Sequence, residues 1–193
     1  MKVLHLTNIH ASSRTIFDAV KKQNWIYIKH TASPEFLDAL IEYDLVIKDR
    51  YPFALSDEFF ADNLVLSWIP SVLPYAVGRN TIIKSFLAGL PVGGSIFFIK
   101  SNNYLVKVVR KFEIEVQPEI DTIEKVYDKI AYKVMELFGK DLGNIIEDQN
   151  VKSPGLFQKI VPTTTNEFFE NADIASVLVN GYETRLSDLS YKI

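Results

Sequence analysis

Short apolar runs alternate with amphipathic stretches through the first half of the chain. Four runs rich in Val, Leu and Ile predict strands at residues 2–6, 25–29, 45–48 and 64–68. Apolar residues at helical spacing predict helices at about residues 14–23, 33–41, 56–61 and 80–87. Because the strands are almost continuously apolar, we expect an α/β fold with a mostly parallel, twisted sheet that helices cover on both faces.

The second half of the chain has a different pattern. An apolar strand is expected at residues 94–99, and residues 105–116 alternate between polar and apolar side chains, as in an edge strand. We therefore predict an antiparallel addition at the edge of the sheet. Asp121, with Glu124 three positions later, resembles a helix capping box, and apolar residues at helical spacing continue to Gly139.

The composition changes again near residue 150, where Asn, Ser, Pro, Thr and Gly become frequent. We predict a boundary there, with an α/β domain at residues 1–149 and a small C-terminal appendage at residues 150–193. Within the appendage, a short helix is expected at residues 166–171. Asn180 followed by Gly181 predicts the turn of a hairpin.

Composition and charge exclude several classes of function. The chain has no cysteine, which excludes disulfides, thiolate metal sites and cysteine nucleophiles. Its 21 Lys and Arg against 24 Asp and Glu give a net charge of −3, without the basic block typical of nucleic-acid binding. No run reaches the roughly 18 apolar residues of a membrane helix, and the first ten residues lack the order of a signal peptide. We therefore expect a cytoplasmic protein that binds neither nucleic acid nor a membrane.

Three loops follow the carboxyl ends of predicted parallel strands, where ligands bind in sheets of this kind. They comprise residues 7–13, 49–55 and 69–80. The third loop contains Pro70, Pro74 and Gly78, which give it a stiff and defined shape. Taken alone, this loop is either an ordinary turn or part of a binding site.

The segment from Ser67 to Gly78 resembles the signature of the formyl-tetrahydrofolate-dependent formyltransferases, in which a strand ends in Asn-x-His-x-Ser-x-Leu-Pro, three variable residues and Gly. Its Leu73-Pro74-Tyr75-x-x-Gly78 is most similar to the branch that formylates amino sugars on nucleotide carriers. Residues 43–47, 94–98 and 120–127 are similar to neighbouring elements of that family, so the resemblance covers about residues 1–149. It implies a Rossmann-like formyltransferase fold, formyl-tetrahydrofolate as the donor, and an amine as the acceptor, with a nucleotide-linked amino sugar favoured.

The residues that carry catalysis in that family are replaced in this sequence. Ser67 and Ile69 stand where the family has the Asn and His that stabilise the oxyanion. Tyr104 stands near the position of the family's Asp, which orients the His. Ser67 can still donate one hydrogen bond, whereas Ile69 can neither donate nor accept a proton. Because the loss of one such group costs about 10² to 10⁴ in rate, we expect impaired catalysis.

The candidate catalytic residues are therefore Ser67, Tyr104 and His10. His10 follows the first strand at the same end of the sheet and could act as a base, although a lone loop histidine is more often only solvated. His5 and His30 are expected in packing or surface positions. Three histidines without an acidic cluster or i, i+4 spacing predict no metal site.

The resemblance also implies binding roles for two groups of residues. Those similar to the folate-lining loop are predicted to bind the cofactor: Arg50, Tyr51, Pro52 and Phe53. Those in the first loop and around the end of the signature are predicted to bind the substrate: Asn8, Ser12, Arg14, Tyr75, Arg79 and Asn80. For the first loop, the alternative is ordinary capping of a helix by Ser12 or Ser13.

Three functions stay open at the level of sequence. The first is a formyltransferase of impaired or altered chemistry, the second a non-catalytic binding or partner protein of the same fold, and the third a different transferase or nucleotide-binding protein. Initiator tRNA is an improbable substrate, because the residues after 149 are too few for the further domain that such enzymes carry and the chain is net acidic. The strand at residues 105–116 and the helix after Asp121 offer candidate homodimer surfaces or ordinary internal packing.

Overall fold

A computed structural model of the chain describes residues 1–32, 43–78, 80–101, 105–147, 158–160, 178 and 180–189. Its contacts group into two compact units. Unit 1 comprises residues 1–68, 96–110 and 134–160, and unit 2 comprises residues 69–95, 111–133 and 161–193. The predicted boundary between residues 149 and 150 and the predicted helices at residues 33–41 and 166–171 lie outside the described residues.

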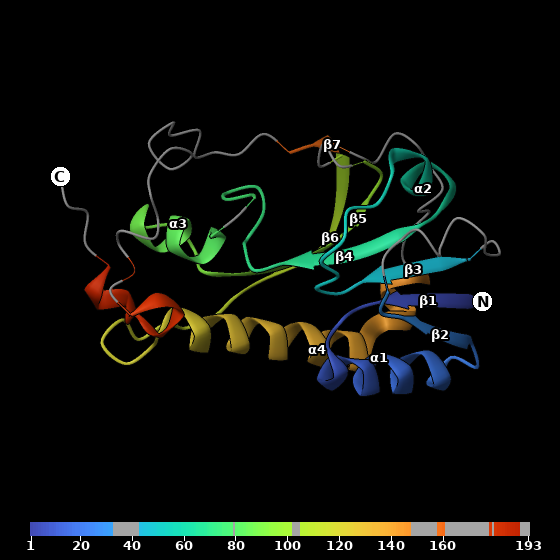
Figure 1. The fold of residues 1–193 in the computed structure, drawn as a ribbon, viewed down its shortest axis with the longest axis horizontal. Coiled ribbons are helices and arrows are strands. Elements are labelled where there is room, and N and C mark those ends of the chain that lie inside the picture. Colours follow the sequence, from blue (N-terminus) through green and yellow to red (C-terminus); the bar gives the residue numbers. More distant parts are fainter. Residues whose placement is uncertain are drawn as a thin grey trace. The chain divides into compact units, whose positions relative to one another are not determined.

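The strands form one seven-stranded sheet in the order β2-β1-β3-β4-β5-β6-β7 (Figure 1). Their bounds are β1 Lys2–Leu6, β2 Ile26–His30, β3 Leu45–Lys48, β4 Val65–Ile69, β5 Gly93–Ile99, β6 Leu105–Glu113 and β7 Gln158–Lys159. Strand β1 pairs with β2 and β3 in parallel, and β3 pairs with β4 in parallel, whereas β6 pairs with β7 antiparallel. The predicted α/β sheet with a mostly parallel core and an antiparallel edge is therefore confirmed.

The chain reverses its direction of winding at β1. It passes from β1 outward to β2 and then returns to place β3 on the other side of β1. In sheets of this kind, the carboxyl ends of the two strands beside such a switch point diverge and leave room for a ligand. The ends of β1 and β3 are thus the part of unit 1 where a site is expected.

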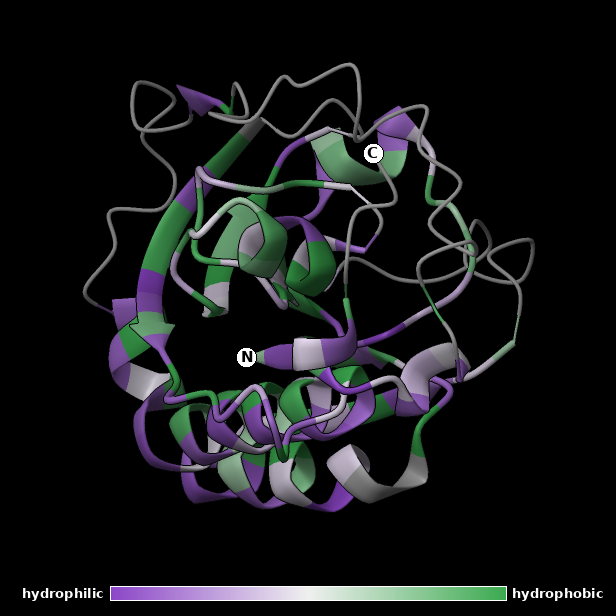
Figure 2. Ribbon diagram, turned by 90° about the vertical axis from the view of Figure 1, so that its left-hand side faces the viewer, coloured by the Kyte–Doolittle hydropathy of each residue, from purple (hydrophilic) through white to green (hydrophobic). Residues whose placement is uncertain are grey.

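Helices cover both faces of the sheet within unit 1 (Figure 1). Leu4 and Leu6 of β1 pack in one apolar cluster with Phe60 of helix α2, Asp57–Asp62. On the opposite face, Tyr27 of β2 meets Phe17 of helix α1, His10–Lys22, with ring centroids 5.4 Å apart. Figure 2 shows apolar and polar residues alternating along the helical ribbons, as expected for helices that bury one side.

Unit 2 contains helix α3, Thr81–Leu87, the first part of helix α4, Ile123–Glu147, and two short 3-10 turns, η3 Gly181–Glu183 and η4 Leu186–Asp188. Its strands approach each other at Gly93 of β5. A Cβ atom there would lie 2.0 Å from the carbonyl oxygen of Phe112 in β6. Only glycine fits at this position, because real Cβ atoms do not come so close to backbone atoms.

Three predicted element boundaries or caps are wrong. Helix α1 begins at His10 and not near residue 14, so part of the predicted loop is its first turn. Helix α4 continues past Gly139 to Glu147, because the buried residues Leu142 and Ile145 maintain the helical period. The predicted hairpin after Asn180 is replaced by η3 and η4.

The predicted capping box at Asp121 is also replaced. The Thr122 hydroxyl accepts the backbone N–H of Lys125 at 3.2 Å, so Thr122 caps helix α4. The Asp121 carboxylate accepts from the Gln117 backbone N–H at 2.8 Å and from the Lys129 ammonium at 2.6 Å. Burial alone raises the pKa of Asp121, but these hydrogen bonds and the Lys129 charge outweigh it and leave the pKa below its usual value.

None of the helices in the described residues is long and apolar enough to span a membrane.

Candidate functional site

A buried carboxylate lies at the switch point of unit 1. Asp49 directly follows β3, and its backbone N–H donates to the carbonyl of Leu6, the last residue of β1, at 2.9 Å. This bond holds the loop after β3 against the end of β1. The Asp49 side chain is fully buried.

Four side chains donate to this carboxylate, and together with it they form the Asp49 cluster. The Ser12 hydroxyl lies 2.5 Å and the Thr7 hydroxyl 3.4 Å from Oδ2. The Trp68 indole N–H lies 2.8 Å and the Arg50 Nε 3.1 Å from Oδ1. An isolated buried carboxylate is costly, but one that accepts several hydrogen bonds is stable in its charged form.

The Asp49 cluster fixes the protonation state of its carboxyl group. Burial raises the pKa of Asp49, but the neighbouring His5 ring, hydrogen bonds from Ser12 and Trp68 and the charge of Arg50 outweigh burial and hold the pKa well below its usual value. The His5 Nε2 lies 3.7 Å from Oδ2, beyond hydrogen-bond distance. Asp49 is therefore ionised at neutral pH and serves as an acceptor.

His5 of β1 lies beside this cluster and is fully buried. Its Nδ1 is 2.8 Å from the Tyr27 hydroxyl, which fixes the ring. Burial raises the pKa of Tyr27, so this hydroxyl keeps its proton at neutral pH. The His5 Nε2 makes no hydrogen bond within the described residues.

The loop after Asp49 contains the predicted cofactor residues. Arg50 has a left-handed backbone, with φ of 51°, and its guanidinium lies 5.8 Å from the centre of the Trp68 ring. The buried Tyr51 donates its hydroxyl to the carbonyl of Ala32, and its ring meets Phe53 edge-on, with centroids 5.2 Å apart. Pro52 and Phe53 are exposed. Arg50 and Tyr51 therefore anchor the loop, while Pro52 and Phe53 form its outer surface.

Strand β4 carries the first part of the signature. The Ser67 hydroxyl donates to the carbonyl of Lys48 in β3 at 3.0 Å. Ile69, two positions later, is buried. Trp68 lies between them in sequence and points its indole N–H to Asp49. Ser67 thus has a hydroxyl already bonded to the backbone, and Ile69 an aliphatic side chain.

The loop after β4 belongs to unit 2 and is held at both ends. The buried Ser95 of β5 donates to the carbonyl of Ser71 at 2.8 Å and accepts the backbone N–H of Leu73 at 2.9 Å. The Thr81 hydroxyl donates to the carbonyl of Pro70 at 2.8 Å. Gly78 has a φ of 83°, which favours glycine. The stiff loop expected from the sequence is therefore present.

A cavity of about 420 Å³ borders this loop within unit 2, and we call it the unit 2 cavity. It has the size of a small-molecule site. The residues around it come from the signature loop, helix α3, the start of helix α4 and η3: Pro70, Gly78, Asn80, Thr81, Ile82, Ile83, Ile123, Glu124, Tyr127 and Tyr182.

The predicted substrate residues lie in different surroundings. Asn8 is exposed. Ser12 is buried and bonded to Asp49, and Arg14 is exposed and paired with Asp18 at 3.0 Å. In unit 2, Asn80 lines the cavity and Tyr75 is half-buried.

Three further candidates have no described side chain. His10 is the first residue of helix α1, but its side chain is outside the described part. Arg79 and Tyr104 lie outside the described residues. No group of three or more His, Asp or Glu side chains that could hold a metal ion occurs among the described residues.

The residues that organise both regions are not among the predicted site residues. Asp49 was passed over, although its position directly after a buried strand is a signal that could have identified it. Trp68 lies within a predicted strand, and no sequence pattern indicates its bond to Asp49. In unit 2, Tyr127 and Tyr182 carry no sequence signal, because they meet at the cavity from segments far apart in the chain.

Comparison with known proteins gives structural matches only. No protein-family model and no curated protein matches the sequence. A formyltransferase from Anoxybacillus kamchatkensis, PseJ, solved with UDP-4,6-dideoxy-4-formamido-L-AltNAc and tetrahydrofolate, has a TM-score of 0.72 at 17% identity and covers 98% of this chain and 97% of its own.

Two further solved structures extend this match. A sugar N-formyltransferase from Shewanella has a TM-score of 0.64 at 16% identity, over 86% of this chain and 74% of its own. A phosphoribosylglycinamide formyltransferase from Brucella melitensis has a TM-score of 0.57 at 18% identity, over 74% of this chain and 93% of its own. Enzymes with different acceptors thus share this architecture, and the chain has the formyltransferase fold.

Proposed function

We propose that this chain is a formyltransferase-like protein that moves a formyl group from formyl-tetrahydrofolate to the amine of a nucleotide-linked amino sugar, at a reduced rate. The observation that carries the proposal is the match over 98% of the chain to a sugar-nucleotide formyltransferase. The signature loop supports it, since Ser95 and Thr81 hold it in a defined shape.

The residues of the loop after Asp49 fit a folate. Phe53 is 38% exposed and, with Pro52, presents an apolar surface on which a flat ring can stack. The Tyr51 ring contacts the Phe53 ring edge-on and so supports its position. When bound, formyl-tetrahydrofolate supplies the formyl group. The chain's part is to hold the donor and to orient it toward the acceptor.

The reduced rate follows from the side chains of β4. In formyl transfer, the carbonyl oxygen gains negative charge while the attacking amine loses a proton. Ile69 can neither donate to that oxygen nor take the proton. The Ser67 hydroxyl has one proton, which it already donates to the Lys48 carbonyl. Binding and orientation therefore provide most of the remaining rate enhancement.

A second candidate function is a non-catalytic protein that keeps the ligand sites of this fold. The observation that favours it is the same hydrogen bond from Ser67 to the Lys48 carbonyl, because it leaves β4 without a donor aimed outward from these two positions. Under this alternative, ligand binding occurs and formyl transfer does not.

Two measurements on the full chain separate these candidates. Calorimetric titration with tetrahydrofolate tests binding, and an assay with formyl-tetrahydrofolate and a panel of nucleotide-linked amino sugars tests transfer. We expect folate binding together with slow turnover that is proportional to protein concentration. Binding without turnover favours the non-catalytic candidate. The absence of folate binding contradicts both.

The remaining predictions from the sequence belong to this proposal. We propose a cytoplasmic protein with a functional α/β domain at residues 1–149, and a homodimer contact through β6 or helix α4.

A further inference from the structure

We propose that the unit 2 cavity binds the base of a nucleoside diphosphate, with Tyr127 and Tyr182 as the stacking rings. This inference deepens the proposed function, since it assigns to a set of residues the part of the acceptor that does not react. It rests on the lining of the cavity, on the way η3 is held, and on the charge around the opening.

The lining of the cavity matches a flat, neutral ring. Ile82, Ile83 and Ile123 supply apolar walls, and two tyrosines border the space. Aromatic side chains stack well on nucleobases, because both have flat π faces. The volume of about 420 Å³ accommodates a base with part of its ribose.

Tyr182 lines the cavity and belongs to the 3-10 turn η3, whose backbone is fixed by hydrogen bonds to neighbouring residues. The Thr184 hydroxyl donates to the Gly181 carbonyl at 2.7 Å, and the Thr184 carbonyl accepts the backbone N–H of Ile123 at 3.2 Å. The backbone N–H of Leu186 donates to the carbonyl of Asp121 at 3.0 Å. Both Thr184 and Leu186 are fully buried.

These contacts fix the backbone of η3, yet the Tyr182 side chain is left uncovered. The residue is 62% exposed and lines the cavity. Because the backbone of η3 is fixed before a ligand arrives, only the Tyr182 side chain loses conformational freedom on binding. Tyr182 is therefore suited to close over a base that Tyr127 contacts from helix α4.

The polar side chains that line the cavity favour binding of the base over binding of the phosphates. None of the described residues that line it is Lys or Arg, and Glu124 adds a negative charge. The Thr81 hydroxyl is already bonded to the Pro70 carbonyl. The Asn80 side chain makes no capping hydrogen bond to helix α3 and Glu124 is exposed, so both can bond to ring N–H and carbonyl groups of a base.

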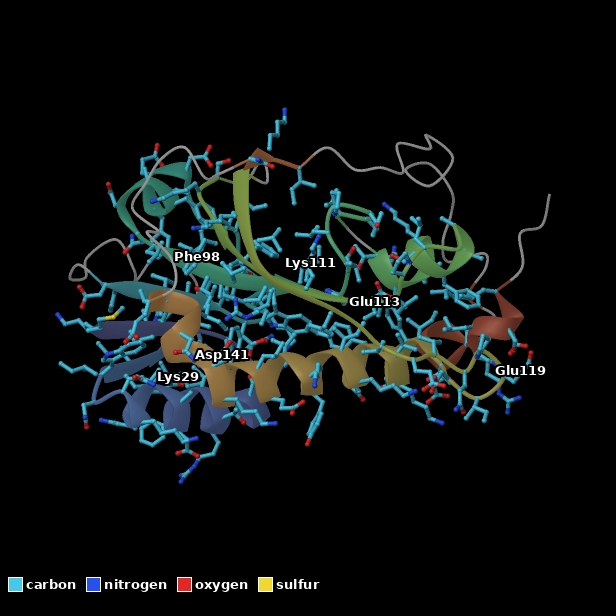
Figure 3. All side chains as sticks on the ribbon, turned by 180° about the vertical axis from the view of Figure 1, so that it is seen from behind. Lys29, Phe98, Lys111, Glu113, Glu119 and Asp141 are labelled. Carbon is cyan, nitrogen blue, oxygen red and sulfur yellow. The ribbon has the colours of Figure 1, made fainter. Side chains whose placement is uncertain are left out.

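The surface next to the cavity supports the same orientation. Glu124 also borders a second pocket whose other acidic residues are Glu119, Asp128, Glu183 and Asp188, against the two cations Lys125 and Arg185. Glu119, labelled in Figure 3, lies at this end of unit 2 beside the two 3-10 turns. This negative surface repels a diphosphate, which therefore stays on the side of the cavity away from it.

The experiment titrates the full chain by calorimetry with UDP, dTDP, GDP and ADP, and with inorganic pyrophosphate, in the absence of folate. We expect at least one nucleotide to bind more tightly than pyrophosphate. Tyr182→Ala and Tyr127→Ala are each expected to weaken that nucleotide by about tenfold. Glu124→Gln is expected to change the order of preference among the bases.

Two controls keep the result interpretable. Tyr132→Ala removes a 75% exposed ring from the same helix α4, outside the cavity, and is expected to leave affinity unchanged. Tyr127→Phe preserves the stacking ring and is expected to retain most of the affinity, which shows that the ring and not its hydroxyl makes the contribution; the circular dichroism spectrum of Tyr127→Ala checks that this variant is folded.

The inference is overturned if no nucleotide binds at millimolar concentration, if pyrophosphate binds as tightly as every nucleotide, or if both alanine variants bind like the unaltered chain. Nucleotide binding without formyl transfer leaves this inference standing while the proposed function fails. Formyl transfer without a contribution from either tyrosine supports the proposed function and overturns this inference.

Discussion

The Asp49 cluster and the unit 2 cavity are opposite kinds of polar arrangement. In the Asp49 cluster, a fully buried carboxylate is bonded to Ser12, Trp68 and Arg50, and both of its oxygens have partners. In the unit 2 cavity, the polar residues Asn80 and Glu124 line an open space. The first arrangement positions loops and leaves no capacity for a ligand, whereas the second retains capacity for one.

This comparison corrects a natural assumption about the switch point. A charged residue at the carboxyl end of a central strand is often taken as a ligand-binding group. Here Asp49 joins the end of β1, helix α1 and strand β4 through hydrogen bonds over sequence distances of 19 to 42 residues. Its role is to hold the loop of Arg50 and Tyr51 in place, and the exposed residues of that loop face the solvent.

Loss of the carboxylate of the Asp49 cluster should have a large effect on stability. Asp49→Ala leaves the Ser12 hydroxyl, the Trp68 N–H and the Arg50 guanidinium without their acceptor, and should cost about 3 kcal/mol in the free energy of unfolding. Urea denaturation measures it. Asp18→Ala, which breaks an exposed ion pair with Arg14, is the matched control and should cost less than about 1 kcal/mol. Equal losses in the two variants would show that the Asp49 cluster has no special structural role.

A smaller effect is expected in the framework of unit 2. Gly93→Ala places a Cβ atom against the Phe112 carbonyl, and the strands must separate at a cost of about 2 kcal/mol. Gly139→Ala, within helix α4, serves as the control. The added Cβ atom would lie 3.5 Å from the Thr15 side chain, which is an ordinary van der Waals contact. That change should stabilise the chain by up to about 1 kcal/mol. Thermal unfolding followed by circular dichroism distinguishes the two signs, and a neutral Gly93→Ala contradicts the close approach of β5 to β6.

A further effect is expected on the free energy of unfolding at acidic pH. Because the folded-state pKa of Asp49 lies below its unfolded value, its contribution to stability is complete above the unfolded pKa of about 4 and is lost as the pH falls toward the folded value. The free energy of unfolding should therefore decline on acidification below about pH 5. Asp49→Asn should flatten this decline more than the same change at Asp18. An unchanged slope in Asp49→Asn would be evidence against an ionised Asp49.

Much of the fold was predictable because apolar spacing determines which segments pack. Strands β1 and β3 were predicted at their observed bounds, since each is a short run of buried aliphatic residues between polar segments. The start of helix α1 was not, because Ser12 and Ser13 are typical of helix caps. In the structure the Ser13 hydroxyl donates to the carbonyl of Ile9 at 2.9 Å and Ser12 donates to Asp49, so both are accommodated inside the helix.

The sites were less predictable than the fold for a physical reason. The signature segment is continuous in sequence, and the rigid loop that it predicted is present. The Asp49 cluster and the unit 2 cavity instead depend on segments that only folding brings together. Tyr182 reaches the cavity because Thr184 and Leu186 bond to the residues before and at the start of helix α4, and no local pattern announces such contacts.

We propose that β4 lacks the side chains that would handle the proton and the oxyanion in formyl transfer. The triple variant Ser67→Asn, Ile69→His and Tyr104→Asp restores the family pattern, and Ile26→His adds a histidine at an exposed position as the control. The decisive measurement is the single-turnover rate of formyl transfer from formyl-tetrahydrofolate to a nucleotide-linked amino sugar. We expect the triple variant to exceed the unaltered chain by about 10² to 10⁴, with no gain from Ile26→His. An unaltered chain that already transfers at the rate of the triple variant would contradict the claim.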